Sequence, residues 1–490
     1  MKRLIASIAL LLTIFFDLPV LAQEPVDAAV NAKIRDEALN RSQVLKTFEH
    51  FTEAIGPRLT ASPAARAADD YAVEVLKQWG IANAHLEPWQ FGRGWQLERS
   101  TIELTEPRYA PLIGYPEAWS ASTIGEIVGT PIFIGNKSLA ELQAMKGQLK
   151  GAIVLSQPLQ DSFERVDRPQ PTLSDTPVAI GQPRPPAGSS PFITNAATNK
   201  AIFETGAAVI LRPNRGEHGT MFVLGRDNGD AAMPSMILSA EHYNMLVRML
   251  ELGLKPKVRV NIQAKYFTDD KNSYNVIAEI PGTDLKDEIV MIGAHLDSWH
   301  AGTGAADNAD GASVALEAMR ILTAIGVKPR RTIRMAVWNG EEEGLLGSQA
   351  YVNKYLAGDA NAAAREKFDV YFNQDPGTGP IYGWYLENNA AIKPIFDAWL
   401  EPFKDLGARK NILQPIGSTD HVSFNRVGVL GFNAVQDYDL YDTRIHHTNM
   451  DVFERVNEKD LKECAAVLAS FAYHAAMRAE KLPTIAKVSN

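Results

Sequence analysis

Four short segments in the C-terminal half of the chain carry histidine and carboxylate side chains, most of them directly after an apolar run. They contain His295 with Asp307, the run Glu341 to Glu343, Asp375, and the pair His446 and His447. Two histidines and three carboxylates, one of them shared, form a borderline-hard ligand set that suits a pair of zinc ions. A fourth carboxylate is then left to act as a base. These residue types therefore indicate a two-metal hydrolytic site.

Each of these segments has a simpler explanation when it is taken alone. A single histidine such as His295 is more often a hydrogen-bonded core residue than a metal ligand, and Asp375 could cap a turn or a helix. The run Glu341 to Glu343 could favour a helix N-terminus, by about 0.3–1 kcal/mol for each carboxylate. His446 and His447 could be an exposed pair. All these explanations would have to hold together, so a shared site is the better interpretation.

The segments belong to a region in which predicted strands and helices alternate. Strands are predicted at 274–280, 288–294, 332–338, 369–372 and 429–435, and helices at 313–322, 345–355, 391–406 and 457–477. This alternation predicts an α/β fold, with a mostly parallel sheet and helices on both faces. The run Ile289 to Ile292 is continuously apolar, as expected of a strand covered on both sides. Ligands bind such sheets at the carboxyl ends of the strands, where His295 and its companions lie.

The residues before this region are expected to form two further parts. Helices are predicted over 30–50 and 64–79, followed by one or two strands between 83 and 105, and we assign residues 23–120 to the N-terminal part of the catalytic domain. From 121 to 262 the chain has short apolar strands, many glycines and prolines, and few candidate catalytic groups. We therefore predict a separate inserted α+β domain at 121–262, with the rest of the catalytic domain at 263–490.

The first 22 residues have the features of a cleaved export signal. Lys2 and Arg3 precede the apolar run Leu4 to Phe16, and Val20-Leu21-Ala22 provides the small residue of a cleavage site. The apolar run is too short to span a membrane, and no later stretch reaches that length. We expect a periplasmic or secreted protein without an integral membrane span; an uncleaved anchor is the alternative.

Charge and cysteine content bear on the expected binding partners and on how the protein is stabilised. The formal net charge is −9 at pH 7 and no basic patch is interleaved with aromatic residues, so nucleic acid is not an expected partner. The single cysteine, Cys464, excludes an intrachain disulfide. An exported protein without disulfides must rely on the size of its core or on bound metal for stability.

The order of the motifs resembles that of the co-catalytic zinc exopeptidases, a family that includes aminopeptidases and glutamate carboxypeptidases. The motifs are Ala294-His295-Leu296-Asp297-Ser298, the run Gly304 to Gly311, the run Glu341 to Ser348, Asp375, and His447-Thr448-Asn449-Met450-Asp451. The run Lys328 to Arg334, Thr419-Asp420 and the paired His446-His447 are most similar to the carboxypeptidase Q branch. Residues 121–262 resemble the protease-associated domain often inserted in these enzymes. The likeness covers most of the mature chain.

The resemblance implies a role for each residue of the site. One zinc ion would be bound by His295 and Asp375, the other by Glu342 and His447, with Asp307 bridging the two. Glu341 would be the general base. Asp297 would accept a hydrogen bond from His295 and fix its tautomer.

Two local details qualify this assignment. The family often has two adjacent acidic residues at the bridging position, whereas Ala306 and Asn308 flank Asp307 here, and the register with Gly311 keeps Asp307 as the bridge. The family also implies a cis peptide bond between Asp307 and Asn308. Four weaker candidates remain outside the ligand set: His300, Asp310, Asp420 and His421. Of these, Asp420 and His421 could line the substrate cleft.

The implied activity is hydrolysis of peptide bonds near a free terminus. The substrate would be a peptide or dipeptide, and the enzyme either an aminopeptidase or a carboxypeptidase Q-like dipeptidase, which the motifs do not distinguish. A non-catalytic binding or receptor-like relative is the alternative, but all five predicted ligands and Glu341 are present. A serine hydrolase would need a Gly-x-Ser-x-Gly elbow, which the sequence lacks. The motifs do not determine the oligomeric state, and a homodimer is one alternative.

Overall fold

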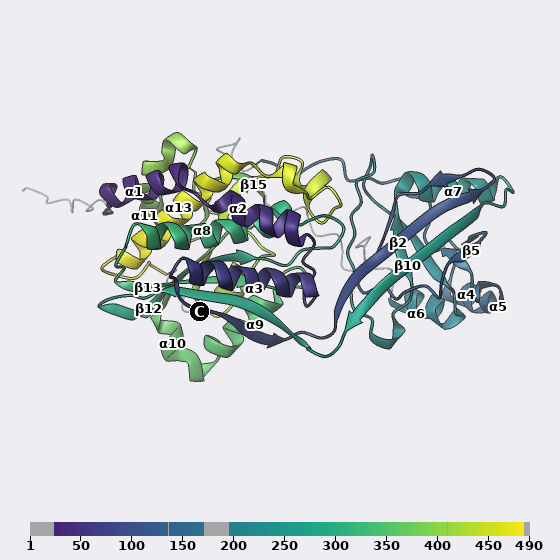
Figure 1. The fold of residues 1–490 in the computed structure, drawn as a ribbon, viewed down its shortest axis with the longest axis horizontal. Helices are drawn as coiled ribbons and strands as arrows, with labels where there is room; N and C mark the ends of the chain where they lie inside the picture. The colour runs from purple at the N-terminus through teal and green to yellow at the C-terminus, as the bar shows by residue number, and fades with distance from the viewer. Residues whose placement is uncertain (1–23, 136, 171–195, 376, 409, 485–490) are drawn as a thin grey trace, which may run out of the picture.

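The computed structural model describes residues 24–135, 137–170, 196–375, 377–408 and 410–484, which form two lobes of different architecture (Figure 1). One lobe is built on a seven-stranded sheet and contains both ends of the described chain. The other contains two smaller sheets. The predicted export signal, residues 1–22, lies outside the described residues.

The large sheet has four parallel strands at its centre and antiparallel strands toward its edges. β13, β12, β14 and β16 are parallel neighbours, while β1, β11 and β15 pair antiparallel. In sheet order the strands are β1 (Ala82–Gln90), β11 (Asn272–Ile280), β13 (Arg331–Trp338), β12 (Leu285–His295), β14 (Phe368–Asn373), β16 (Leu430–Asp437) and β15 (Thr378–Tyr385). The predicted mostly parallel α/β sheet is confirmed.

Helices cover both faces of this sheet. One face is covered by α1 (Ala28–Asn40), α2 (Val44–Glu49), α3 (Pro63–Gln78), α8 (Asp310–Ala324), α11 (Lys393–Leu400) and α13 (Glu458–Met477). The other is covered by α9 (Leu346–Tyr355) and α12 (His421–Asn425), with α10 (Ala362–Lys367) nearby. On β12, Val290 and Ile292 face the first set of helices and Met291 faces the second. Both faces of the strand are buried, which explains its unbroken apolar run.

Two elements of this lobe differ from the sequence-based expectation. The strand β15 was not predicted, and it pairs antiparallel with β16 at the edge of the sheet. The helix predicted over 391–406 ends at Leu400 and continues as a 3₁₀ segment, Glu401–Leu406. Pro402 is the second residue of this segment, and because proline has no N–H it cannot continue the α-helical hydrogen bonding.

The second lobe combines two sheets with four short helices. The first sheet has the order β3 (Ala110–Pro111), β2 (Gly94–Glu106), β10 (Lys257–Phe267), β5 (Ile127–Gly129), and the second β4 (Gly114–Pro116), β9 (Ser235–Leu238), β8 (Val209–Pro213), β7 (Ile153–Leu155), β6 (Ile132–Phe133). The helices are α4 (Leu139–Ala144), α5 (Lys146–Leu149), α6 (Ala196–Thr205) and α7 (Ala240–Glu251). The strands of both sheets therefore come from residues 94–267. The proposed inserted domain, 121–262, lies within this range.

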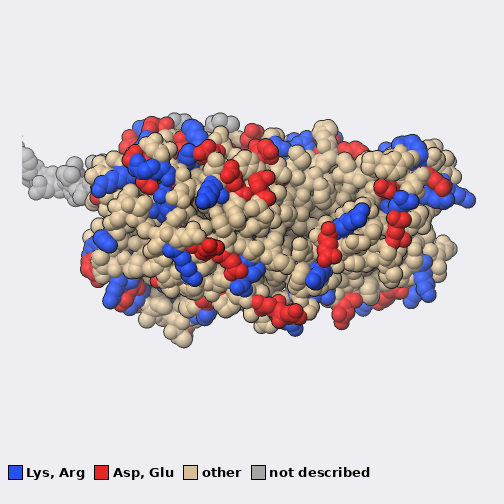
Figure 2. Space-filling model, viewed as in Figure 1, with Lys and Arg blue, Asp and Glu red and all other residues tan. Residues whose placement is uncertain are grey.

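The surface carries charges of both signs. Figure 2 shows Lys and Arg interspersed with Asp and Glu over the face that it presents. Within the described part of the chain, no helix is both long enough and apolar enough to cross a membrane.

Candidate active site

The residues predicted to form the site meet at one edge of the large sheet. The four central strands are parallel, so their carboxyl ends share this edge. His295 ends β12, while Glu341 and Asp375 lie just beyond β13 and β14. His447 lies in the loop after β16. Asp307 lies in the segment η3 (Ala305–Ala309) between β12 and α8, where the backbone is kinked and not helical at Asp307.

The carboxylate of Asp307 lies between the two histidines. Its Oδ1 is 3.2 Å from Nε2 of His295, and its Oδ2 is 3.4 Å from Nε2 of His447. On the His295 side, Asp375 Oδ1 and Glu341 Oε2 lie 3.8 Å and 4.0 Å from the same Nε2. The site therefore has two halves that one carboxylate joins.

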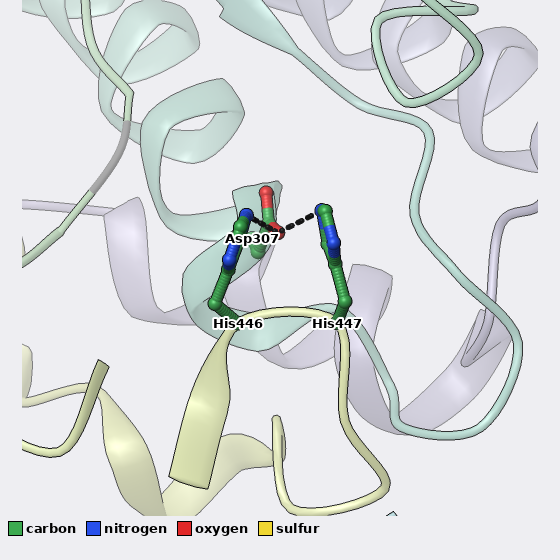
Figure 3. Close-up of side chains that lie close together, drawn as sticks. All are labelled: Asp307, His446 and His447. Carbon is green, nitrogen blue, oxygen red and sulfur yellow. Dashed lines mark ion pairs between the residues drawn. The ribbon is translucent and has the colours of Figure 1, made fainter. Parts of the chain in front are cut away.

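The half around His447 includes a histidine that the sequence-based ligand set left out. His447 Nε2 lies 2.8 Å from Oε2 of Glu342. Both His446 and His447 point toward Asp307 from the same loop (Figure 3), and His446 Nε2 lies 3.9 Å from Asp307 Oδ2. Asp307, His446 and His447 can all offer ligand atoms within 4.8 Å of one another, as can His295, Glu341 and Asp375. The adjacent histidines were the only sequence signal for a role of His446.

The chemistry of this cluster fits divalent cations. His295 Nε2, Asp307 Oδ2 and Glu342 Oε1 are buried and have no hydrogen-bond partner among the described residues. Although burial favours the neutral imidazole, the charges of Glu341 and Asp375 raise the pKa of His295 well above its ordinary value. Buried carboxylates crowded together are costly without positive charge nearby. Zinc, which nitrogen and carboxylate oxygen bind, would supply that charge.

Asp297 has a different contact from the predicted one. Nδ1 of His295 lies 3.1 Å from the main-chain oxygen of Asp297 and 3.5 Å from its carboxylate. The carboxylate instead accepts the main-chain N–H groups of Glu341 and Glu342, at 3.3 and 3.2 Å, and the Thr60 hydroxyl at 2.9 Å. Asp297 therefore fixes the histidine through its main chain and the glutamate loop through its side chain.

Asp451 supports the Asp307 segment in a similar way. Its carboxylate accepts the main-chain N–H groups of Ala306 and Asp307, at 2.8 and 3.2 Å. Burial, reinforced by the charge of Asp307, raises the pKa of Asp451 to about 7. The peptide bond between Asp307 and Asn308 is cis, as the family resemblance implies.

Arg58 is the buried residue that ties the loops of the site together. It is fully buried, and its guanidinium donates to five main-chain oxygens: Phe51, Gly56, Leu296, Thr303 and Gly304. Burial lowers the pKa of Arg58 to about 10, so it remains charged at neutral pH.

We expect Arg58→Met to lower the free energy of unfolding by about 3–5 kcal/mol, because buried carbonyl oxygens lose their donors. Thermal and denaturant unfolding of the metal-free protein measures the effect. Arg365→Met is the matched control, since Arg365 donates to the main-chain oxygens of Leu356 and Gly358 from a more exposed position. Equal losses in the two variants would contradict a special role for Arg58.

The second lobe holds the loop that carries His447. Phe222 and Thr448 form an antiparallel bridge, and Val223 N donates to the main-chain oxygen of His447 at 3.2 Å. Asn449 N donates to Met221 O at 3.1 Å, and Met221 N donates back to Asn449 Oδ1 at 2.7 Å. Half of the site is therefore positioned by residues from the other lobe.

A second contact between the lobes lies just before this loop. Arg168 makes a bidentate ion pair with Asp442, and its guanidinium lies over the ring of Tyr438 at 4.5 Å. Tyr441 in turn stacks on His446, with ring centroids 5.1 Å apart. The segment around Arg168 therefore contacts the residues that precede the histidine pair.

The four weaker candidates lie around the site in different ways. Asp420 is fully buried, neither of its carboxylate oxygens has a hydrogen-bond partner among the described residues, and burial raises its pKa to about 7. His421 is also buried and lies 3.1 Å from Ile416 O. His300 lies 2.8 Å from Pro116 O in the second lobe, and Asp310 is buried at the start of α8. None of them lies in the two ligand groups found among the described residues.

A buried cluster of imidazoles and carboxylates at the carboxyl edge of an α/β sheet, with this order of motifs, defines a zinc metallopeptidase. Residues 275–472 match the model of the family described as Peptidase family M28. Over this range the chain is similar to that peptidase family.

Similarity to known proteins extends over most of the chain. Human carboxypeptidase Q is 25% identical over 459 residues, covering 93% of this chain and 89% of its own. A solved peptidase M28 precursor from Shewanella amazonensis is 26% identical, with a TM-score of 0.69 over 94% of this chain and 99% of its own. The zinc aminopeptidase BSAP from Bacillus subtilis shares the fold, at 19% identity and a TM-score of 0.60, over 89% of this chain and 94% of its own.

Proposed function

We propose that this protein is a di-zinc exopeptidase that hydrolyses peptides or dipeptides at a bond near a free terminus. The observation that carries the proposal is the position of Asp307, whose two carboxylate oxygens lie 3.2 and 3.4 Å from the Nε2 atoms of His295 and His447. A carboxylate between two imidazoles is suited to bridge two ions. His295 and Asp375 would complete one ion's ligands, and Glu342 and His447 those of the other.

Zinc bound at these residues would lower the pKa of a water molecule toward about 7 and polarise the substrate carbonyl. In this proposal Glu341 would take the proton from the attacking water and return it to the nitrogen of the leaving amine. Burial and the charge of Asp375 raise the pKa of Glu341, although His295 opposes them. A carboxyl with a raised pKa can hold the proton between the two steps.

Asp297 and Asp451 would keep this arrangement in place. Asp297 orients the N–H groups of Glu341 and Glu342, and Asp451 those of Ala306 and Asp307. Neither carboxylate needs to touch the substrate. Supporting carboxylates of this kind limit how far ligands can move when the ions and the substrate bind.

The direct test counts metal and measures hydrolysis in the same preparation. We expect two zinc ions per chain and cleavage of unblocked dipeptides by the loaded enzyme. Dipeptides blocked at the amino or the carboxyl terminus then show which free terminus is required. One ion per chain at full activity would contradict the bridging role of Asp307, and cleavage of doubly blocked peptides would contradict an exopeptidase.

Asn449 provides a separate prediction about the second ion. Asn449→Ala removes the acceptor of Met221 N and the donor to Gly219 O, at 2.7 and 3.2 Å. Because the His447 loop is then held less firmly, we expect metal affinity in that half to fall about 10–100-fold. Zinc titration measures this, with Asn40→Ala on α1 as the control, where an exposed Asn donates to the Asp36 carboxylate. Unchanged affinity of both ions would show that the lobe contact is dispensable.

We also propose that the chain is exported and cleaved after Ala22. The support is the sequence pattern of residues 1–22, with Lys2 and Arg3 ahead of an apolar run. N-terminal sequencing of the mature protein and fractionation of the producing cells test this, and a retained Met1 would contradict it.

A further inference from the structure

The loop that carries Glu341 is held at its first residue by a side chain from outside the site. Asn339 follows β13 and is fully buried. Its side-chain amide donates to Asp69 Oδ1 at 2.7 Å and to the main-chain oxygen of Tyr274 at 2.6 Å. Because both neighbours accept hydrogen bonds, the orientation of the amide is fixed. Asp69 lies on α3, 270 residues earlier in the chain.

The first and last residues of this loop are in close contact. The main-chain N–H of Asn339 donates to Asn275 Oδ1 at 3.3 Å, and Asn275 Nδ2 donates to Gly347 O at 3.0 Å. A side chain at Gly347 would overlap the main-chain oxygen of Asn339. Between them, Gly344 N donates to Glu341 O at 2.8 Å. The glutamate is therefore part of a compact turn, and a displacement of Asn339 would be transmitted to it.

Asp69 is well suited to fix Asn339. The residue is 1% exposed, and a carboxyl group removed from water needs a hydrogen-bond donor, which the amide of Asn339 supplies. Burial raises the pKa of Asp69 well above its ordinary value, and the hydrogen bond from Asn339 acts in the opposite direction. A protonated carboxyl group keeps one acceptor oxygen, so the contact persists in either state.

We propose that Asp69 is a positioning residue for the general base: through Asn339 it holds the loop that places Glu341 beside His295. In the structure Glu341 Oε2 lies 4.0 Å from His295 Nε2. This inference rests on the proposed role of Glu341 and adds a residue from the N-terminal part of the chain. Asp297 holds the same loop by a different atom, the main-chain N–H of Glu341. The loop is thus fixed both from α3 and from the segment after β12.

The next residue on α3, Asp70, provides a matched control. Its side chain is 57% exposed and pairs with Arg66 of the same helix at 3.0 Å. An exposed ion pair within one helix contributes little to stability. A substitution at Asp70 therefore changes the charge of the same helix without removing the buried contact with Asn339.

The test measures dipeptide hydrolysis and zinc content of Asp69→Leu, using the zinc-loaded full chain. We expect kcat to fall about 10–100-fold, the usual range for a residue that orients a group of the site, while KM and zinc content stay unchanged. Asp69→Asn keeps an acceptor oxygen for Asn339 and should lose less than about threefold. Asp70→Leu should match the native enzyme.

A double substitution shows whether Asp69 acts through Asn339. Asn339→Ala removes the contact from its other side and should lower kcat by a similar factor, so it also tests the role if Asp69→Leu does not fold. Adding Asp69→Leu to it should lower kcat no further, because residues that act through one contact are not additive. Losses that multiply would overturn the proposal. Loss of zinc in Asp69→Leu would overturn it as well, since the effect would then pass through the metal ligands.

Hydrogen exchange of the zinc-loaded protein tests the contact without turnover. Asp69→Leu should raise amide exchange across residues 340–347 by at least about tenfold, and Asp70→Leu should leave it unchanged. Raised exchange in a protein that hydrolyses no peptide would support the positioning contact and overturn the peptidase function. Native kcat in Asp69→Leu would overturn the positioning role alone.

Discussion

Glu341→Gln is expected to lower kcat by about 10³–10⁴-fold, because the amide cannot accept the proton of the attacking water. The amide has nearly the same shape as the carboxylate, and Asp297 still binds the main-chain N–H of residue 341, at 3.3 Å in the native protein. The zinc content and KM should therefore stay close to those of the native enzyme. Steady-state kinetics with metal analysis of the same sample measures both.

Neighbouring glutamates provide matched controls for this substitution. Glu342→Gln should lose activity together with zinc, because Glu342 contacts His447 at 2.8 Å and is the proposed ligand. Glu343→Gln should lose less than about tenfold, since neither metal nor proton transfer is assigned to it. If Glu343→Gln were the inactive variant that keeps its zinc, the base would be assigned to the wrong residue of the run.

Removal of zinc by a chelator is expected to stop peptide hydrolysis, with a loss of more than about 100-fold, and added zinc should restore it. The buried carboxylates would then lose the positive charge that offsets their repulsion, so the thermal midpoint of the metal-free protein should fall as well. Activity assays and calorimetric unfolding on the same chelated and reloaded samples measure the two effects.

When zinc is added back in steps, the dependence of activity on the amount of bound zinc shows whether both ions are needed. If both ions act on one substrate, activity should follow occupancy of the more weakly bound ion. Hydrolysis that persists in protein shown to contain no metal would rule out the proposed mechanism. A midpoint that does not change would show that the acidic cluster is not held together by the ions.

Much of the catalytic lobe could be predicted from the sequence, because its signals are local. The apolar run Ile289 to Ile292 and the polar residues after it specify a buried strand that ends at His295, and the structure has β12 at Leu285–His295. Helix α13, predicted over 457–477, spans Glu458–Met477, with Cys464 buried in the core as its apolar pattern indicates. These patterns depend on burial and periodicity within a few residues, so a single chain can reveal them.

The edges of the sheets were harder to predict. The strand β15 carries glycines and half-buried residues, and its strand conformation depends on pairing with β16. Likewise β2 pairs with β10, more than a hundred residues later in the chain, and together they form the sheet that begins the second lobe. Such pairings are non-local, and no residue pattern within either strand specifies the partner.

By itself, the sequence determined which side chains could form the site and which class of fold would carry them. Both depend on short segments, because a residue's ligand type and its position at a strand end can be recognised locally. Only the tertiary structure decided how these residues are held: Asp297 and Asp451 bind main-chain N–H groups of the ligand loops, and Met221 and Phe222 from another lobe fix the His447 loop. These contacts join segments far apart in the chain, and they form only once both lobes have folded and packed against each other.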